Sequence, residues 1–203
     1  ENMTMTFPRH GMTALVGESG CGKSTVVNLL FGAFRPNTGV VTVGGKKLES
    51  LSRTSYYSHL AVVSYNTYIF NETVRANFRL AKPQVTDEEI CAALEKVNLL
   101  TFLQENGGLD KIITEDAANI SGGQKQRLSI ARALVKKPEI FIFDDSFSAL
   151  DFKTDSQLRK ALKEYTKDAT TVIVAQRIST ILGADQIIVL DDGHMAGIGT
   201  HKE

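Results

Sequence analysis

The chain has 203 residues, of which 42% are hydrophobic, and its 23 basic and 23 acidic side chains give a formal net charge of zero. This length and apolar content suffice for one packed domain, or for one domain with a smaller subdomain. A nucleic-acid partner is not expected, because binding a polyanion requires a basic excess. Two cysteines cannot form a disulfide framework, which favours a reducing compartment. No apolar run approaches the roughly 18 residues that span a bilayer.

In chain order, the first elements are two strands and a helix, with a glycine-rich loop before the helix. Residues 3–7 alternate weakly between apolar and polar, which predicts a strand. Residues 13–16 predict a short buried strand, and residues 26–31 predict a helix. Between them, residues 17–25 read Gly-Glu-Ser-Gly-Cys-Gly-Lys-Ser-Thr and fit the phosphate-loop pattern G-x-x-x-x-G-K-[ST]. The order of strand, loop and helix favours a nucleotide-binding loop over a chance glycine-rich turn.

The chemistry of phosphate binding explains the spacing in this loop. Glycines let several backbone N–H groups converge on phosphate oxygens, and the N-terminus of the following helix favours an anion. We expect Lys23 to contact the β- and γ-phosphates, Ser24 to offer its hydroxyl to Mg²⁺, and Cys21 to lie beside the phosphates. The predicted nucleotide-binding residues of the loop are Gly17, Ser19, Gly20, Cys21, Gly22, Lys23, Ser24 and Thr25.

The middle of the chain changes from strands to helices. Residues 40–43 predict a strand that enters a hairpin, and residues 60–64 predict a further strand. Residues 86–89 read Thr-Asp-Glu-Glu, which is a capping box, and apolar residues then recur at helical spacing up to residue 100. Residues 102–113 are expected to form a loop. We expect residues from about 68 to about 135 to form a mainly helical insertion in the core.

A second anion-binding feature and a pair of carboxylates follow. Ser121 is expected to cap a helix that runs to Val135, and its Ser-Gly-Gly start exposes backbone N–H groups. Residues 140–143 are continuously apolar, as in a strand of a parallel sheet covered on both faces. Asp144 and Asp145 end this strand, and ligands of open α/β sheets bind beyond the carboxyl ends of strands, so we expect both on the phosphate side. The remaining predicted elements are a helix at 151–165, strands at 171–175 and 186–190, and a hairpin turn at 191–194.

Taken together and in this order, the motifs resemble the nucleotide-binding domain of ATP-binding cassette (ABC) transporters. They are the phosphate loop, Ile120–Gln124, Ile140–Asp145, Ser148–Asp151 and the run from Gln176 to Thr180. The resemblance implies an α/β fold: a P-loop NTPase core with a mostly parallel sheet, a small antiparallel β-subdomain and a helical subdomain, with residues 1–203 forming one such domain.

The resemblance also implies ligands and a partner. MgATP would be held by the phosphate loop, with Ser24 and Asp144 on the metal. A second nucleotide-binding domain would pair head to tail, so that Ser121, Gly122, Gly123 and Gln124 cover the partner's ATP. Asp151 would cross the interface between the two domains and link the two ATP sites.

Two further stretches resemble exporter sequences. They are Phe70–Asn77 and the region around Glu115. The resemblance implies that Tyr65–Thr73 and the Glu115 region touch a transmembrane domain, on the cytoplasmic face of a membrane. We expect the chain to be part of a longer polypeptide, because it starts at Glu1-Asn2 and reaches the phosphate loop within two strands.

Three positions depart from the family pattern and define the expected activity. Asp145 replaces the usual Glu, Gln176 replaces the switch His, and Tyr65 replaces a Gln near the metal, although a shift of one residue would place Asn66 there. Phosphoryl transfer depends on positioning and electrostatics, so an ATPase with these catalytic residues is expected to bind ATP but to turn it over slowly.

Three interpretations of the function are compared. The first is an ATPase domain of a membrane exporter with a weakened site of its own, which resembles the degenerate half of a heterodimeric ABC exporter. The second is a regulatory half that does not hydrolyse ATP. The third, a soluble ABC ATPase of DNA repair or translation, is disfavoured because sustained heptads and a basic patch are both absent from the sequence.

Overall fold

The computed structural model describes residues 2–175 and 181–202, which divide into two compact units. The first, here called the sheet unit, comprises Glu1–Val62, Glu139–Asp145 and Asp168–Glu203. The second, here called the helical unit, comprises Val63–Pro138 and Ser146–Lys167. The insertion expected between residues 68 and 135 falls in the helical unit, which also takes in the segment after Asp145.

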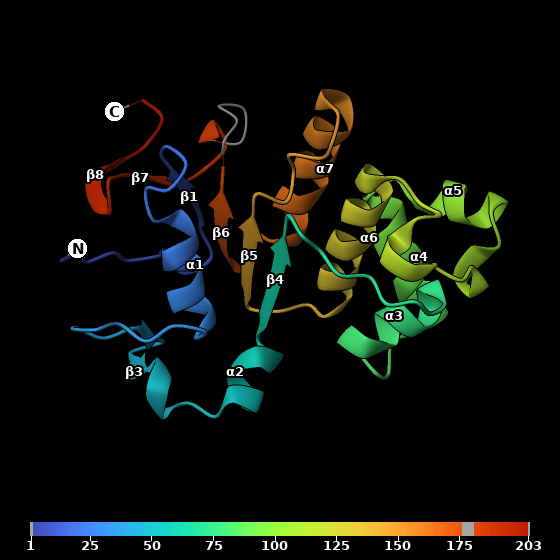
Figure 1. The fold of residues 1–203 in the computed structure, drawn as a ribbon, viewed down its shortest axis with the longest axis horizontal. Coiled ribbons are helices and arrows are strands. Elements are labelled where there is room, and N and C mark those ends of the chain that lie inside the picture. Colours follow the sequence, from blue (N-terminus) through green and yellow to red (C-terminus); the bar gives the residue numbers. More distant parts are fainter. Residues whose placement is uncertain (1, 176–180, 203) are drawn as a thin grey trace. The chain divides into compact units, whose positions relative to one another are not determined.

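A six-stranded sheet in the order β4-β5-β6-β1-β7-β8 organises the sheet unit (Figure 1). Its strands are β1 (Met12–Val16), β4 (Leu60–Ser64), β5 (Ile140–Asp144), β6 (Thr170–Val174), β7 (Gln186–Asp191) and β8 (His194–Gly199). The pairs β5–β6, β6–β1 and β1–β7 are parallel, whereas β7 and β8 form an antiparallel hairpin. The mostly parallel α/β sheet expected from the sequence is therefore confirmed.

The register of this sheet brings two predicted motifs to one edge. Asp144 at the end of β5 lies opposite Val174 of β6, and Val174 lies opposite Leu15 of β1. Gly17, the first residue of the phosphate loop, follows two residues after Leu15. Since neighbouring strands are about 4.8 Å apart and only β6 separates them, β5 and β1 lie roughly 10 Å apart there.

Apolar side chains of the strands pack with those of α1 in the sheet unit. Helix α1 (Lys23–Phe31) packs against β5, and a short hairpin of β2 (Thr42–Val43) and β3 (Lys46–Lys47) precedes α2 (Arg53–Ser58). The buried cluster includes Leu15, Val26, Leu60, Ile142, Val172 and Ile188. The antiparallel hairpin was expected, but its strands are only two residues long.

The prediction of a strand at residues 3–7 is wrong. These residues form no regular element, and Gln186 donates a side-chain hydrogen bond to the carbonyl oxygen of Thr6 at 2.9 Å. The alternating apolar residues Met3, Met5 and Phe7 nevertheless pack against the core of the sheet unit. The alternation of apolar and polar residues therefore indicates that one side of the segment is buried. A strand also requires backbone hydrogen bonds to a neighbouring strand, which sequence alternation does not supply.

The helical unit consists of five α-helices and two short 3₁₀ turns among the described residues. They are α3 (Val74–Ala81), α4 (Asp87–Lys96), α5 (Leu100–Glu105), η2 (Gly108–Asp110), η3 (Glu115–Ala117), α6 (Gly122–Val135) and α7 (Phe152–Tyr165). Helix α4 packs against α3, α5, α6 and α7. The capping box at Thr86 and Glu89 is present, and Ile90 and Leu94 are fully buried, as the helical spacing predicted.

The expected loop at 102–113 is partly wrong. Residues Leu100–Glu105 form α5, and Leu103 in it is only 2% exposed. Leu99 precedes the helix without a side-chain cap, so the sequence carries no start signal there. Burial of an apolar side chain stabilises this helix instead. A helix of six residues is too short for the periodicity of its apolar residues to be recognised in the sequence.

Within residues 2–175 and 181–202, every helix is too short or too polar to cross a bilayer.

Candidate functional site

The phosphate loop of the sheet unit follows β1 and enters α1. Gly17, Gly20 and Gly22 have φ values of 147°, 84° and 106°, a region that residues with a side chain rarely adopt. A Cβ atom on Gly17 would lie 2.1 Å from the carbonyl oxygen of Leu190 and 2.6 Å from the Sγ atom of Cys21. The loop is therefore folded tightly against the end of β7, and Gly17 is required for steric as well as conformational reasons.

Lys23 already points into the curl of this loop. Its ammonium donates hydrogen bonds to the carbonyl oxygens of Gly17 at 2.8 Å and Glu18 at 2.6 Å. The N-cap residue of α1, Gly22, provides no side-chain cap. The first N–H groups of α1 thus remain available for an anion, beside a lysine whose charge is held at the same place.

Cys21 takes part in the loop through its backbone. Its side chain is only 4% exposed and belongs to the buried cluster of the sheet unit, whereas its carbonyl oxygen accepts a hydrogen bond from Gly193 N–H at 3.2 Å. The Cys21 Sγ atom also accepts a hydrogen bond from the Lys23 ammonium at 3.5 Å, so the thiol packs beneath the loop next to the group expected to bind the phosphates. Its place beside the phosphates stays a prediction.

Asp144 and Asp145 are the acidic residues at the same edge of the sheet. Burial raises the pKa of Asp144, the adjacent charge of Asp145 raises it further, and the charge of Lys23 opposes both effects. Asp144 therefore lies close enough to Lys23 and Asp145 to interact with both electrostatically. A carboxylate oxygen of Asp144 and the hydroxyl of Ser24 are hard oxygen donors, which suits Mg²⁺ completed by phosphate oxygens and water.

Asp145 has a φ of 50°, in the left-handed region. Aspartate tolerates this conformation better than most residues, because its short polar side chain can hydrogen-bond locally. The backbone at this position thus offers a physical reason for aspartate, rather than the longer glutamate of the family pattern.

The signature segment, Ser121–Gln124, begins α6 in the helical unit. The Ser121 hydroxyl accepts a hydrogen bond from Gln124 N–H at 3.2 Å, and Gln124 Oε1 accepts one from Ser121 N–H at 2.8 Å. A Cβ on Gly122 would meet no atom within 4 Å, and Gly122 is exposed. The predicted cap is confirmed, and the open surface at Gly122 is free of neighbouring atoms that would obstruct an incoming ligand.

Asp151 also lies in the helical unit, where it caps α7. Its Oδ1 accepts a hydrogen bond from Thr154 N–H at 2.9 Å, and its Oδ2 accepts one from the Thr154 hydroxyl at 2.6 Å. The side chain is exposed, so the capping role leaves it accessible from solvent. Capping alone accounts for an aspartate at this position, and its role at an interface stays a prediction.

The other predicted catalytic residues have different positions. Tyr65 is 57% exposed, and the neighbouring Asn66 is exposed as well, in the bend that follows β4. Gln176 lies outside the described residues. The assignment of Tyr65, Gln176 and Asp145 to catalysis therefore remains a prediction.

The two stretches that the resemblance assigned to a transmembrane partner lie side by side. Ile113 N–H donates to the Glu72 carbonyl and Val74 N–H donates to the Lys111 carbonyl, each at 3.0 Å, around a bridge between Thr73 and Ile112. No sequence motif marked this pairing, which joins segments nearly 40 positions apart.

Apolar side chains stand out from these paired stretches. Tyr68, Phe70 and Ile112 are 61%, 43% and 60% exposed. The rings of Tyr68 and Phe70 meet edge to face, with their centroids 4.8 Å apart. The stretch alternates, since Ile69 between them is only 2% exposed. Tyr68, Phe70 and Ile112 thus form an exposed apolar surface, and the buried side chain of Ile69 fixes the stretch between Tyr68 and Phe70.

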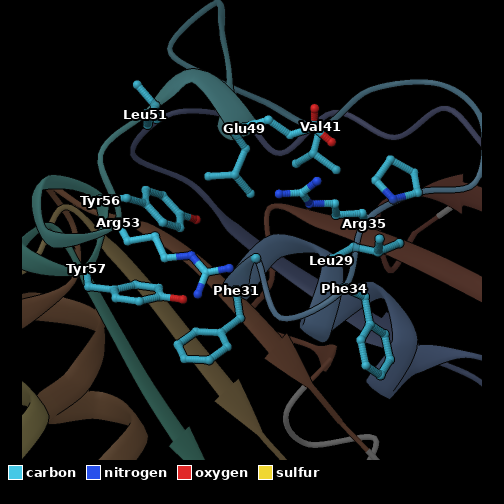
Figure 2. A pocket seen from close by; sticks show the side chains of 13 residues that line it. Leu29, Phe31, Phe34, Arg35, Val41, Glu49, Leu51, Arg53, Tyr56 and Tyr57 are labelled. Atoms are coloured by element: carbon cyan, nitrogen blue, oxygen red, sulfur yellow. The ribbon is translucent and has the colours of Figure 1, made fainter.

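A separate hollow of about 90 Å³ lies in the sheet unit, where α1 ends and α2 begins (Figure 2). Phe31 and Tyr57 form one side, with rings stacked 5.1 Å apart, and the guanidinium groups of Arg35 and Arg53 point into it. Ligand pockets have volumes of roughly 300–1,000 Å³. This hollow is thus too small for a nucleotide, and the phosphate loop is not among its lining residues.

The sheet order, the phosphate loop after β1 and the carboxylate at the end of β5 together define a P-loop nucleotide-binding domain. Residues 1–148 match the family model described as ABC transporter. The chain is 41% identical to an uncharacterised ABC transporter ATP-binding protein of Haemophilus influenzae over 192 residues, 95% of this chain and 34% of that protein. A similar protein of Sinorhizobium fredii is 39% identical over 98% of this chain and 34% of its own length.

A solved structure shares the fold. It is described as a bacterial Atm1-family ABC exporter with ATP bound, and it superposes with a TM-score of 0.92 at 34% identity, over 97% of this chain and 34% of that one. The chain therefore belongs to the ABC transporter family and has the fold of its ATP-binding domain. It spans about a third of the length of the curated relatives it matches.

Proposed function

We propose that the chain is the ATP-binding and hydrolysing domain of an ABC exporter, coupling ATP binding and slow hydrolysis to transport across a membrane. The observation that carries this proposal is the register of β1, β6 and β5, which brings the phosphate loop and Asp144 to one edge of the sheet. The similar exporter structure with ATP bound supports the same ligand here.

Each residue at this edge has a definite task with MgATP. Lys23 turns its ammonium from the loop carbonyls to the phosphates, and the free N–H groups of α1 bind the phosphate oxygens. Ser24 and Asp144 hold Mg²⁺, which neutralises phosphate charge when bound. Asp145 orients the attacking water and accepts its proton.

The signature segment serves a second domain of the same kind, bound head to tail. The open surface at Gly122 and the exposed N-terminus of α6 suit the phosphates of an ATP held by the partner. Asp151 would reach across the same interface. We propose a heterodimer, because the signature segment is intact while Asp145, Gln176 and Tyr65 depart from the family pattern.

The apolar surface of Tyr68, Phe70 and Ile112 would contact the transmembrane domain, on the cytoplasmic face of the membrane. Its support is the backbone pairing of the two stretches, Tyr65–Thr73 and the run that leads to Glu115. Exposed apolar side chains gathered on a hydrogen-bonded surface are typical of an interaction site.

An experiment on turnover distinguishes this function from the alternative of a regulatory half that does not hydrolyse ATP. ATP binding and ATP turnover are measured on the chain and on the Asp145→Glu/Gln176→His variant, at concentrations that permit dimers. Because a ~1 Å misplacement costs about a hundredfold in rate, we expect the variant to be at least ~10-fold faster with similar ATP affinity. The control is Asp168→Glu, which makes the same Asp-to-Glu change at an exposed position outside the site and should leave turnover unchanged.

Three results are informative. Measurable turnover that rises in the variant supports a slow ATPase. Tight binding with no turnover, in the chain and the variant alike, supports the regulatory half. Brisk turnover in the unaltered chain contradicts the positional argument. Because Glu at position 145 would adopt a φ near 50°, the free energy of unfolding of the variant is measured alongside.

A further inference from the structure

Helix α7 carries an ion pair between Asp155 and Arg159 that the proposed function does not use. Asp155 is 0% exposed, and the Arg159 Nε atom donates a hydrogen bond to its Oδ1 at 2.8 Å. A terminal nitrogen of Arg159 also bonds to Oδ2, so the pair is bidentate. The Arg159 side chain is 17% exposed, so only the carboxylate of the pair is fully buried. Burying a carboxylate costs desolvation that attraction to its partner often does not recover, so stability alone does not explain the pair.

The guanidinium of Arg159 lies over the ring of Phe147. Its central carbon is 5.7 Å from the centre of the Phe147 ring, within the range of a cation–π contact. Phe147 is 5% exposed and follows the Asp144-Asp145 pair by two positions. The ion pair therefore holds the segment that leaves the end of β5, here called the linking segment, Ser146–Asp151.

The linking segment is fixed at three points along its length. The Ser146 hydroxyl donates to the Val63 carbonyl at 2.7 Å, and Ser146 is fully buried. Phe147 is held beneath Arg159, and its carbonyl accepts a hydrogen bond from Leu150 N–H at 3.1 Å. The segment then ends in Asp151, which caps α7, the helix that carries the ion pair. Phe147 and Asp151 are thus tied to the same helix.

The linking segment also lies against the signature segment. A Cβ atom on Gly123 would be 3.6 Å from the Ala149 carbonyl oxygen and 3.8 Å from the Leu150 Cδ2 atom. Burial lowers the pKa of Arg127 on α6, and the charge of Asp151 partly opposes this shift, so Asp151 lies close enough to α6 to interact with it. A shift of the linking segment would therefore displace both Asp151 and the start of α6.

We propose that Asp155, Arg159 and Phe147 form a clamp of positioning residues, which sets the placement of Asp151 and of the signature segment for the ATP of the partner domain. This inference rests on the proposed function. In this proposal the clamp does not contact a nucleotide. It acts through the backbone of the linking segment. It predicts that loosening the clamp lowers turnover while ATP binding at the phosphate loop of the same chain persists.

The test uses Phe147→Leu, which removes the ring and leaves the ion pair. The control is Tyr165→Leu at the other end of α7, where Lys96 Nζ lies at the same 5.7 Å from the ring centre. A third variant, Arg159→Lys, keeps the charge for Asp155 but loses the planar fork, and it replaces Phe147→Leu if that variant fails to fold. For each, kcat and KM for ATP are measured, together with amide hydrogen exchange.

Phe147→Leu is expected to lower kcat at least ~10-fold and to leave KM within about twofold, because misplacement acts on the reacting geometry and not on ATP binding. The amide of Leu150 should exchange at least ~10-fold faster, whereas amides of α4 and of the last two turns of α6, away from the signature segment, stay within about twofold. Tyr165→Leu should change neither kcat nor the exchange rate of the Leu150 amide.

Two results would overturn the proposal. Equal kcat values in Phe147→Leu and Tyr165→Leu would remove the clamp from turnover. Faster exchange throughout the helical unit would assign the pair a general structural role. If the unaltered chain shows no turnover, the proposed function fails. The clamp is then tested by amide exchange in Phe147→Leu alone. Faster exchange confined to the Leu150 amide supports the clamp, and unchanged exchange refutes it.

Discussion

Replacing Gly17 by alanine tests the packing of the phosphate loop most directly. The added Cβ would lie 2.1 Å from the Leu190 carbonyl oxygen, about 1.3 Å short of ordinary contact at 3.4 Å. Overpacking of this kind costs about 1–3 kcal/mol, and the φ of 147° adds roughly 1–3 kcal/mol for a residue with a side chain. We therefore expect Gly17→Ala to lower the free energy of unfolding by about 2–6 kcal/mol.

The same variant should lose ATP affinity. The clash is relieved only if the loop or the end of β7 moves by about 1 Å, and a displacement of that size costs roughly a hundredfold when groups must converge on a ligand. Urea unfolding gives the stability, and titration with MgATP gives the affinity.

Two glycines provide matched controls for this variant. Gly20→Ala keeps a φ of 84° but meets no atom within 4 Å, so only the conformational cost of about 1–2 kcal/mol remains. Gly197→Ala meets no atom and has no positive φ, so its stability should change by less than about 1 kcal/mol. Equal stability and ATP affinity for Gly17→Ala and Gly197→Ala would refute the steric argument.

Three further predictions concern the signature segment, the metal site and the core. Gly122→Ala should leave stability unchanged or raise it by up to about 1 kcal/mol, yet abolish ATP-dependent dimerisation in light scattering, since open space there is proposed to admit the partner's ATP. Burial and then Asp145 raise the pKa of Asp144 against the opposing charge of Lys23, so the folded chain binds a proton more readily than the unfolded chain. The free energy of unfolding should then fall as pH rises from about 4 through the raised value, while Mg²⁺-dependent ATP binding strengthens; Asp144→Asn should abolish both trends, and their persistence would contradict this assignment. Burial raises the pKa of Tyr56 to about 12, and its hydroxyl donates to the Leu30 carbonyl at 2.7 Å. Stability should therefore fall between about pH 10 and pH 12, and Tyr56→Phe should remove that fall and cost about 1–3 kcal/mol at neutral pH in urea unfolding.

Local patterns identified most elements because their causes are local. The glycines and lysine of the phosphate loop, the capping boxes at Thr86 and Ser121, and the apolar run of β5 each act over a few residues. Backbone hydrogen bonding and side-chain alternation over such distances can be recognised without knowledge of the fold.

The wrong predictions depend on packing between elements, which local sequence patterns do not register. Residues 3–7 alternate as a strand would, but their backbone forms no ladder with a described neighbour. Helix α5 carries no cap, and burial of Leu103 takes the place of one. For residues 3–7 the partner is Gln186, far away in the chain, whereas α5 packs against α4 and η2, its neighbours in sequence.

The sequence by itself determined the family resemblance, the residues proposed for MgATP, and the carboxylate at the end of β5, because each depends on residue type at fixed spacing. Tertiary structure alone decided that Cys21 packs inward, that Asp145 lies at a left-handed φ, and that the stretch around Thr73 pairs with Ile112. It also decided the clamp of Phe147 by Arg159. The physical reason is range: capping and loop geometry act between near neighbours, whereas burial, strand pairing and cation–π contact depend on which distant surfaces the fold brings together.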